Sequence, residues 1–110
     1  MNPGYKRLDQ DNEFTPTGLQ VGGKITHILG VDGTAWVEMP ITALAGRNAI
    51  QIFNRSATDI LYLEFDNTVP TGDGIPVAIG GYWATDIAPT IPVYASTGGA
   101  AVKVTVVEVA

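Results

Sequence analysis

The stretch Arg47–Phe65, RNAIQIFNRSATDILYLEF, decides the fold class of this 110-residue chain. Within it, apolar and polar residues alternate over 47–54 and again over 58–65, and the polar turn NRSA lies between the two segments. Alternation of this kind is typical of β-strands that bury one face. We predict two antiparallel strands here, joined as a hairpin.

Six further short apolar segments flank this stretch, separated by turn residues, at 24–29, 34–39, 75–79, 82–87, 91–95 and 101–109. Asp32-Gly33 is a strong hairpin signal and predicts that the first two of these segments pair. In the last segment the alternation slips at Val106-Val107, which predicts a β-bulge or burial on both sides. Pro76 and Pro92 are expected at a strand start or a sheet edge.

The composition supports the same fold class. Val, Ile and Thr number 33 together, against 19 for Leu, Glu, Lys, Arg and Gln, and β-branched side chains suit strands better than helices. We predict an all-β fold, an antiparallel β-sandwich or jelly roll of about eight strands over residues 24–110. An immunoglobulin-like sandwich is the second topology considered. Residues 1–23 show no sustained period and are expected to form an extended N-terminal arm, either disordered or ordered on a neighbouring subunit.

Charge and cysteine content exclude several classes of protein. The 11 acidic and 6 basic residues give a net charge of −5, which argues against a reader of nucleic-acid phosphates. The absence of cysteine excludes a disulfide scaffold, a Cys-ligated zinc site and a thiol nucleophile. No apolar stretch reaches the length needed to cross a bilayer and no signal peptide is recognised, so we expect no membrane partner.

Catalytic side chains are scarce. His27 is the only histidine, and Ser56 and Ser96 are the only serines, with no Gly-x-Ser-x-Gly elbow around either. We therefore expect that the protein is not an enzyme and takes no cofactor. A calcium site is one possibility for the acidic loop, because its oxygen ligands could come from Glu64, Asp66, Asn67 and Asp73. Turn-forming residues account for the same composition.

Two aromatic residues are candidates for a binding surface. Tyr82 and Trp83 are adjacent, so in a regular strand they point to opposite faces and one of them is expected to be exposed. An exposed ring could be buried in a subunit interface or could stack on a sugar. The interface is the preferred interpretation.

Residues 46–110 resemble small virion proteins of tailed bacteriophages. The resemblance lies in four pieces: GRNAIQIFNRSATDILYLEF, TGDGIPVAIGGYW, IPVYASTGGA and VKVTVVEVA. It implies a β-sandwich or jelly-roll subunit of the virus particle, a capsid decoration (cement) protein or the capsid-bound part of a head fibre. Such proteins commonly assemble as trimers on the shell.

From this resemblance we expect a structural virion protein that is made in the host cytoplasm, binds the major capsid protein on the outer capsid surface and forms a homotrimer. The expected contact residues of the arm are Tyr5, Lys6, Arg7, Leu8 and Phe14. The alternative is a carbohydrate-binding or receptor-binding module of a virion fibre that uses Tyr82 or Trp83.

Overall fold

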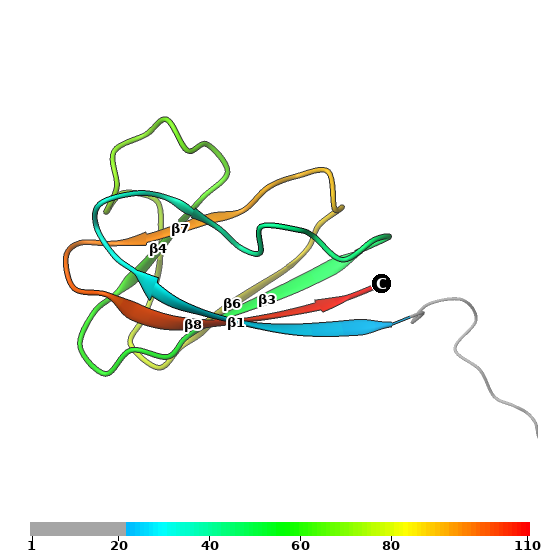
Figure 1. The fold of residues 1–110 in the computed structure, drawn as a ribbon, viewed down its shortest axis with the longest axis horizontal. Coiled ribbons are helices and arrows are strands. Elements are labelled where there is room, and N and C mark those ends of the chain that lie inside the picture. The colour runs from blue at the N-terminus through cyan, green and yellow to red at the C-terminus, as the bar shows by residue number, and fades with distance from the viewer. Residues whose placement is uncertain (1–21) are drawn as a thin grey trace, which may run out of the picture.

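The structure, a computed structural model, describes residues 22–110. Over this part of the chain the regular structure is entirely β, and no helix that could cross a membrane occurs there. Figure 1 shows the eight strands: β1 (Gly23–Val31), β2 (Val37–Glu38), β3 (Ala49–Asn54), β4 (Leu61–Glu64), β5 (Ile75–Val77), β6 (Tyr82–Asp86), β7 (Tyr94–Thr97) and β8 (Val102–Val109).

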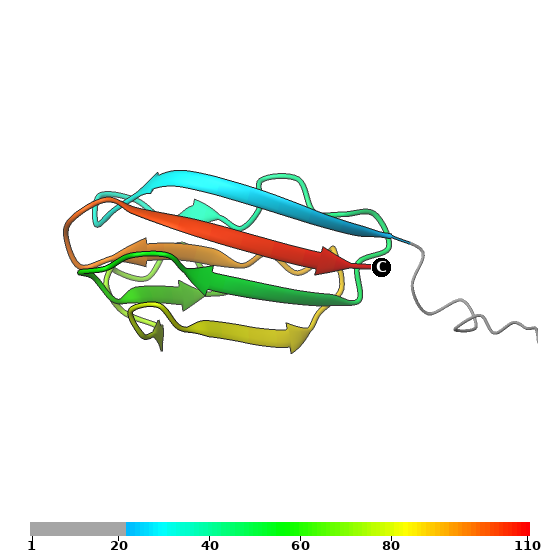
Figure 2. The same cartoon turned by 90° about the horizontal axis from the view of Figure 1, so that it is seen from below.

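The strands form two antiparallel four-stranded sheets, stacked as two layers in Figure 1. The first sheet has the order β1-β8-β3-β6, which Figure 2 shows from edge to edge, and the second has the order β2-β7-β4-β5. The pairing is nested along the chain, because β1 pairs with β8, β2 with β7, β3 with β6 and β4 with β5. The all-β antiparallel fold expected from the sequence is therefore confirmed as a β-sandwich.

The core lies between the two sheets and follows from the alternation in the strands. In β3 and β8 every second residue is buried, and in β4 Leu61 and Leu63 face the same core. Burial of each such aliphatic side chain contributes about 1.5–3 kcal/mol. The buried apolar cluster consists of Val31, Met39, Ile50, Ile52, Leu61, Leu63, Val77, Ile87, Val93, Ala95, Val102, Val104 and Val106.

One end of the sandwich is fastened by a buried ion pair. Arg47 and Glu108 are 3% and 0% exposed, and the Arg47 guanidinium donates to Glu108 Oε2 over 2.9 Å. The same guanidinium donates to the carbonyls of Ala88 and Ile91, and the Leu44 amide donates to the Glu108 carboxylate. The pair therefore connects β8 to the β2–β3 loop and to the β6–β7 loop at this end.

The eight strand positions expected from the sequence are confirmed, with shifted ends. Within the segment 34–39 only the two residues of β2 form a strand, and Met39 and Pro40 come after them. Pro76 lies in β5, at the edge of its sheet, and Pro92 precedes β7. Both prolines thus occupy the edge or strand-start positions expected of a residue without an N–H.

Both predicted hairpins are wrong. β1 and β2 belong to different sheets, and so do β3 and β4. The turn after β3 is real, but it carries the chain from one sheet to the other: the Asn54 side chain donates to the carbonyls of Asp59 and Val77, and its Oδ1 accepts from the Ser56 amide. Alternation identifies the buried face of a strand but does not identify the strand beside it.

The β-bulge predicted at Val106-Val107 is wrong, whereas the alternative, burial on both sides of the strand, holds in part, because the outward-facing Thr105 is buried between Val104 and Val106. β8 keeps a continuous register with β3 from Val104 to Val109, and the apparent slip arises because the inward position after Val106 is filled by Glu108. The β-bulge lies in β1 instead. There Leu29 and Gly30 together oppose Lys103, and Gly30 adopts a φ of 75° that favours glycine.

Candidate functional site: the open face of the first sheet

The second sheet has part of its outer side, around Ser96, covered by the chain itself. Ser96 points outward from β7, yet it is fully buried, and its hydroxyl accepts a hydrogen bond from the Gly72 amide. The Trp36 indole donates to the Val69 carbonyl over 2.7 Å, and the Thr71 hydroxyl donates to the Gly33 carbonyl. These bonds hold the 65–74 loop against the sheet. We call this the covered face.

The first sheet has no such cover among residues 22–110. We call its outward side the open face, and its register aligns the side chains in three rows across the four strands. The rows are Gly23, Val109, Ala49 and Asp86; Ile25, Val107, Gln51 and Ala84; and His27, Thr105, Phe53 and Tyr82. Seven of these twelve residues are apolar or aromatic, which is unusual for a sheet side that faces water.

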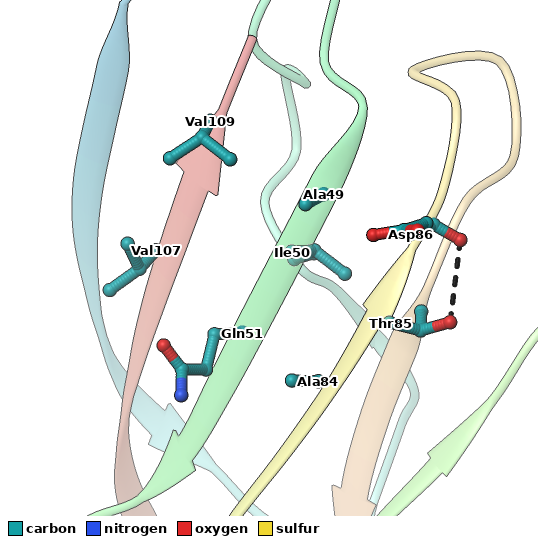
Figure 3. A pocket seen from close by; sticks show the side chains of 8 residues that line it. All are labelled: Ala49, Ile50, Gln51, Ala84, Thr85, Asp86, Val107 and Val109. Carbon is teal, nitrogen blue, oxygen red and sulfur yellow. Dashed lines mark hydrogen bonds between the residues drawn. The ribbon is translucent and has the colours of Figure 1, made fainter. Parts of the chain in front are cut away.

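A shallow hollow of about 360 Å³ lies in the middle of the open face. Figure 3 shows its floor, where the small side chains of Ala49 and Ala84 leave space between larger neighbours. Val107 and Val109 border it on the β8 side, and Asp86 borders it at the sheet edge. The hollow is mostly apolar, so its chemistry favours contact with a surface and offers few groups for a reaction.

β1 adds an unpaired edge beside this face. It is the first strand of its sheet and pairs only with β8 among the described strands. Ile25 is 62% exposed and Leu29 is 71% exposed. A long edge strand with exposed apolar side chains is a template for pairing with another chain unless something covers it.

The two aromatic candidates point to opposite sides, as expected. Tyr82 lies on the open face, is 62% exposed and packs beside Phe53, with ring centroids 5.6 Å apart. Trp83 points inward, where it packs against the core and lies 6.2 Å from the Phe65 ring. Of the pair, Tyr82 is the residue that the structure offers to a partner or a sugar.

The candidates for catalysis, His27 and the two serines, do not contact one another within the described residues. His27 Nδ1 lies 3.0 Å from the Thr105 hydroxyl on the open face. Ser96 belongs to the second sheet, and Ser56 accepts hydrogen bonds from the amides of Thr58 and Asp59. Within residues 22–110, the structure therefore brings His27 together with a threonine and with neither serine.

The acidic loop between β4 and β5 forms turns. Asp66 accepts hydrogen bonds from the hydroxyl and the amide of Thr68, and these bonds lower the pKa of its carboxyl below the ordinary value. Glu64 accepts from the amide of Phe65. Among the described residues no three acidic or histidine side chains gather as metal ligands would.

The arm expected over residues 1–23 lies outside the described residues except for Gly22 and Gly23, and so do its candidate contacts Tyr5, Lys6, Arg7, Leu8 and Phe14. The open face itself was not predicted from the sequence. A signal for it existed in β8, where VKVTVVEV carries valines on both sides of the strand. Comparison of the chain with protein-family models, with curated proteins and with solved structures finds no match.

Proposed function

We propose that this chain is a structural subunit that docks on a larger protein assembly and on copies of itself through the open face. The observation that carries the proposal is the contrast in cover: one sheet buries the outward-facing Ser96 under its own loop, while the other leaves Ile25 and Tyr82 each 62% exposed. An apolar side left toward solvent is typical of a surface that a partner covers.

The size of the open face supports an assembly with more than one contact. Four strands spaced ~4.8 Å apart and five to nine residues long cover on the order of 450 Å². Stable interfaces bury roughly 800 Å² on each partner. The face would therefore need a second contribution, and the unpaired edge of β1 and the expected arm at residues 1–23 are the segments proposed to supply it.

The assembly that fits this proposal best is the outer capsid shell of a tailed bacteriophage, with the chain acting as a decoration protein in a homotrimer that binds the major capsid protein. The sequence resemblance motivates the phage assignment. We further propose that the sandwich is a jelly roll, since its two sheet orders and nested pairing agree with that topology.

The test uses capsid shells that lack the protein. We expect the purified chain to bind such shells and to scatter light as a trimer. Ile25→Lys should abolish binding, because it places a charge in the row of the open face that runs from Ile25 through Val107 to Ala84. Ile60→Lys is the matched control, since Ile60 is also exposed, at 41%, but lies in the β3–β4 connection outside the face. A monomer without affinity for shells would refute the proposal.

A second candidate function rests on the Tyr82–Phe53 pair. An exposed tyrosine supported by a second ring can stack on the apolar side of a sugar. This would make the chain a carbohydrate-binding module of a virion fibre. A glycan array with the wild-type chain and Tyr82→Ala tests it, and binding that Tyr82→Ala leaves unchanged would contradict it.

A further inference from the structure

A second hollow, of about 320 Å³, lies at the opposite end of the open face from Ala49. It is bounded by β1, by β8 and by the residue after β3. Its lining residues are His27, Leu29, Arg55, Lys103, Val104 and Thr105. We call it the basic hollow, because three of these six side chains carry or can gain a positive charge and none is acidic.

The basic hollow stands out against the charge of the described chain. Residues 22–110 contain eight acidic and four basic residues. Of the four, Arg47 is buried against Glu108, and Lys24 lines a different cleft, between β1 and β2. Both remaining cations, Arg55 and Lys103, line the one hollow, and neither forms an ion pair with a carboxylate of residues 22–110.

The Thr105 hydroxyl organises the basic hollow. It accepts a hydrogen bond from the Arg55 guanidinium over 3.3 Å and lies 3.0 Å from His27 Nδ1. When the imidazole is protonated, Nδ1–H donates to the same oxygen, so the hydroxyl hydrogen becomes available to a ligand. The guanidinium keeps further N–H groups with which it can grip an oxyanion in a fork.

The β-bulge of β1 forms part of the wall. Leu29 and Gly30 together oppose Lys103, and a bulge of this kind bends a strand and re-aims its side chains. Leu29 lines the hollow and is exposed, so an apolar surface lies next to the cations. At ~30 Å³ for each water molecule, the hollow has room for about ten, which is enough for an anion and part of the group that bears it.

We propose that the basic hollow binds a doubly charged oxyanion, phosphate or sulfate, free or as an ester. Arg55 and Lys103 supply two fixed positive charges, Thr105 supplies a hydroxyl donor, and His27 adds a third charge when protonated. A dianion matches two cations better than a carboxylate does. The proposal goes beyond docking on a shell, and its test uses the purified chain alone, so the two proposals can fail separately.

The experiment follows amide NMR signals of the full ¹⁵N-labelled chain during titration with sodium sulfate, inorganic phosphate, phenyl phosphate and sodium acetate at matched ionic strength. Saturable shifts are expected at His27, Lys103 and Thr105, and none at Ala49 or Ala84, which line the other hollow. Sulfate and phosphate should bind more tightly than acetate. Tighter binding of phenyl phosphate than of phosphate would support an ester as the ligand, and equal binding would support the free anion.

Charge variants separate a site from a general charge effect. Arg55→Gln and Lys103→Gln should each weaken sulfate binding about tenfold. Lys24→Gln removes the same charge from β1 outside the hollow and should leave binding unchanged. Equal weakening by all three, or shifts that do not saturate, would overturn the proposal. Spectra of each variant without ligand report whether it is folded.

A pH series tests the part of His27. Imidazole gains its proton between pH 8 and pH 5, whereas sulfate keeps its charge over that range. Arg55 and Lys103 are the charged groups that line the hollow with His27. Sulfate binding should therefore tighten as the pH falls, and His27→Gln should remove this dependence. The same dependence in His27→Gln would overturn the role given to His27.

Discussion

The two outer sides of this sandwich differ in what covers them. On the covered face, the 65–74 loop lies over Ser96 of β7, and the indole of Trp36 holds the loop through Val69. On the open face, no loop of residues 22–110 crosses the strands, and Figure 2 shows all four of them uncovered. Both sheets have four strands and a shared core, so the difference lies in their connections.

This difference teaches that cover depends on the path that a connection takes as well as on strand sequence, because the ten-residue connection between β2 and β3 leaves the first sheet uncovered. The ten residues 65–74 fold back over the second sheet, whereas Asn54 and Ser56 hold the β3–β4 connection as a compact corner. The outer side of the first sheet therefore stays uncovered within residues 22–110. The following predictions test the contrast, from the largest expected effect to the smallest.

The largest effect is expected beneath the open face. Glu108→Ala leaves Arg47 buried without its carboxylate, and such a loss typically lowers the free energy of unfolding by about 3–5 kcal/mol. Urea denaturation measures it. Glu64→Ala is the control, because that partly exposed carboxylate binds only the next amide, and it should cost far less. The double variant Arg47→Met with Glu108→Leu should recover much of the loss, and equal losses in Glu108→Ala and Glu64→Ala would contradict the role of the pair.

A smaller effect is expected where the covered face is fastened. Trp36→Phe keeps an aromatic ring but removes the hydrogen bond to Val69, which should lower the free energy of unfolding by about 1 kcal/mol. Hydrogen exchange at the Gly72 amide should speed up, because that amide is bound to Ser96 under the loop. Tyr82→Phe is the control, since it alters an exposed ring on the open face and should leave exchange at Gly72 unchanged. Unchanged exchange in Trp36→Phe would show that the loop is held by other contacts.

On the open face, substitution of an exposed apolar side chain should hardly change the free energy of unfolding. Ile25→Lys alters a side chain that is mostly in water, so the free energy of unfolding should stay within about 0.5 kcal/mol of wild type. Thermal and urea denaturation of the isolated chain check this. A loss as large as that of Trp36→Phe would mean that Ile25 packs within its own subunit, and the contrast between the two faces would fail.

The smallest expected effect is a pH dependence of the free energy of unfolding that arises from Asp66 in the 65–74 loop. Thr68 lowers the pKa of Asp66 in the folded chain, so this carboxylate stabilises the fold above the ordinary aspartate pKa of ~3.9. That contribution disappears as the pH falls below this value. Asp66→Asn retains an oxygen that can accept from Thr68 but does not titrate, so its urea midpoint should fall less between pH 5 and pH 2. Asp32, whose pKa Thr34 lowers in the same way, remains in both chains as an internal reference.

Much of this fold could be predicted from local pattern, because alternation in segments such as Ala49–Asn54 depends only on which side is buried. Strand pairing could not, since the partner of β1 is β8, at the far end of the chain. The alternation of β8 is obscured by Glu108, because a carboxylate at an inward position is interpretable only once its partner Arg47 is known. The open face escaped prediction for a related reason: its rows combine residues from four separate segments.

The nested pairing has a consequence for how the molecule forms. β8 is the last of the eight strands to be synthesised, yet it lies between β1 and β3 in the first sheet. The first sheet cannot form completely until β8 has been synthesised, and β1 has no strand to pair with before then. Contacts so distant in sequence make folding slow, whereas β4 and β5, the one consecutive pair that is hydrogen-bonded, can form early. The exposed apolar side chains of β1 are thus open to pairing with other chains until β8 has been synthesised.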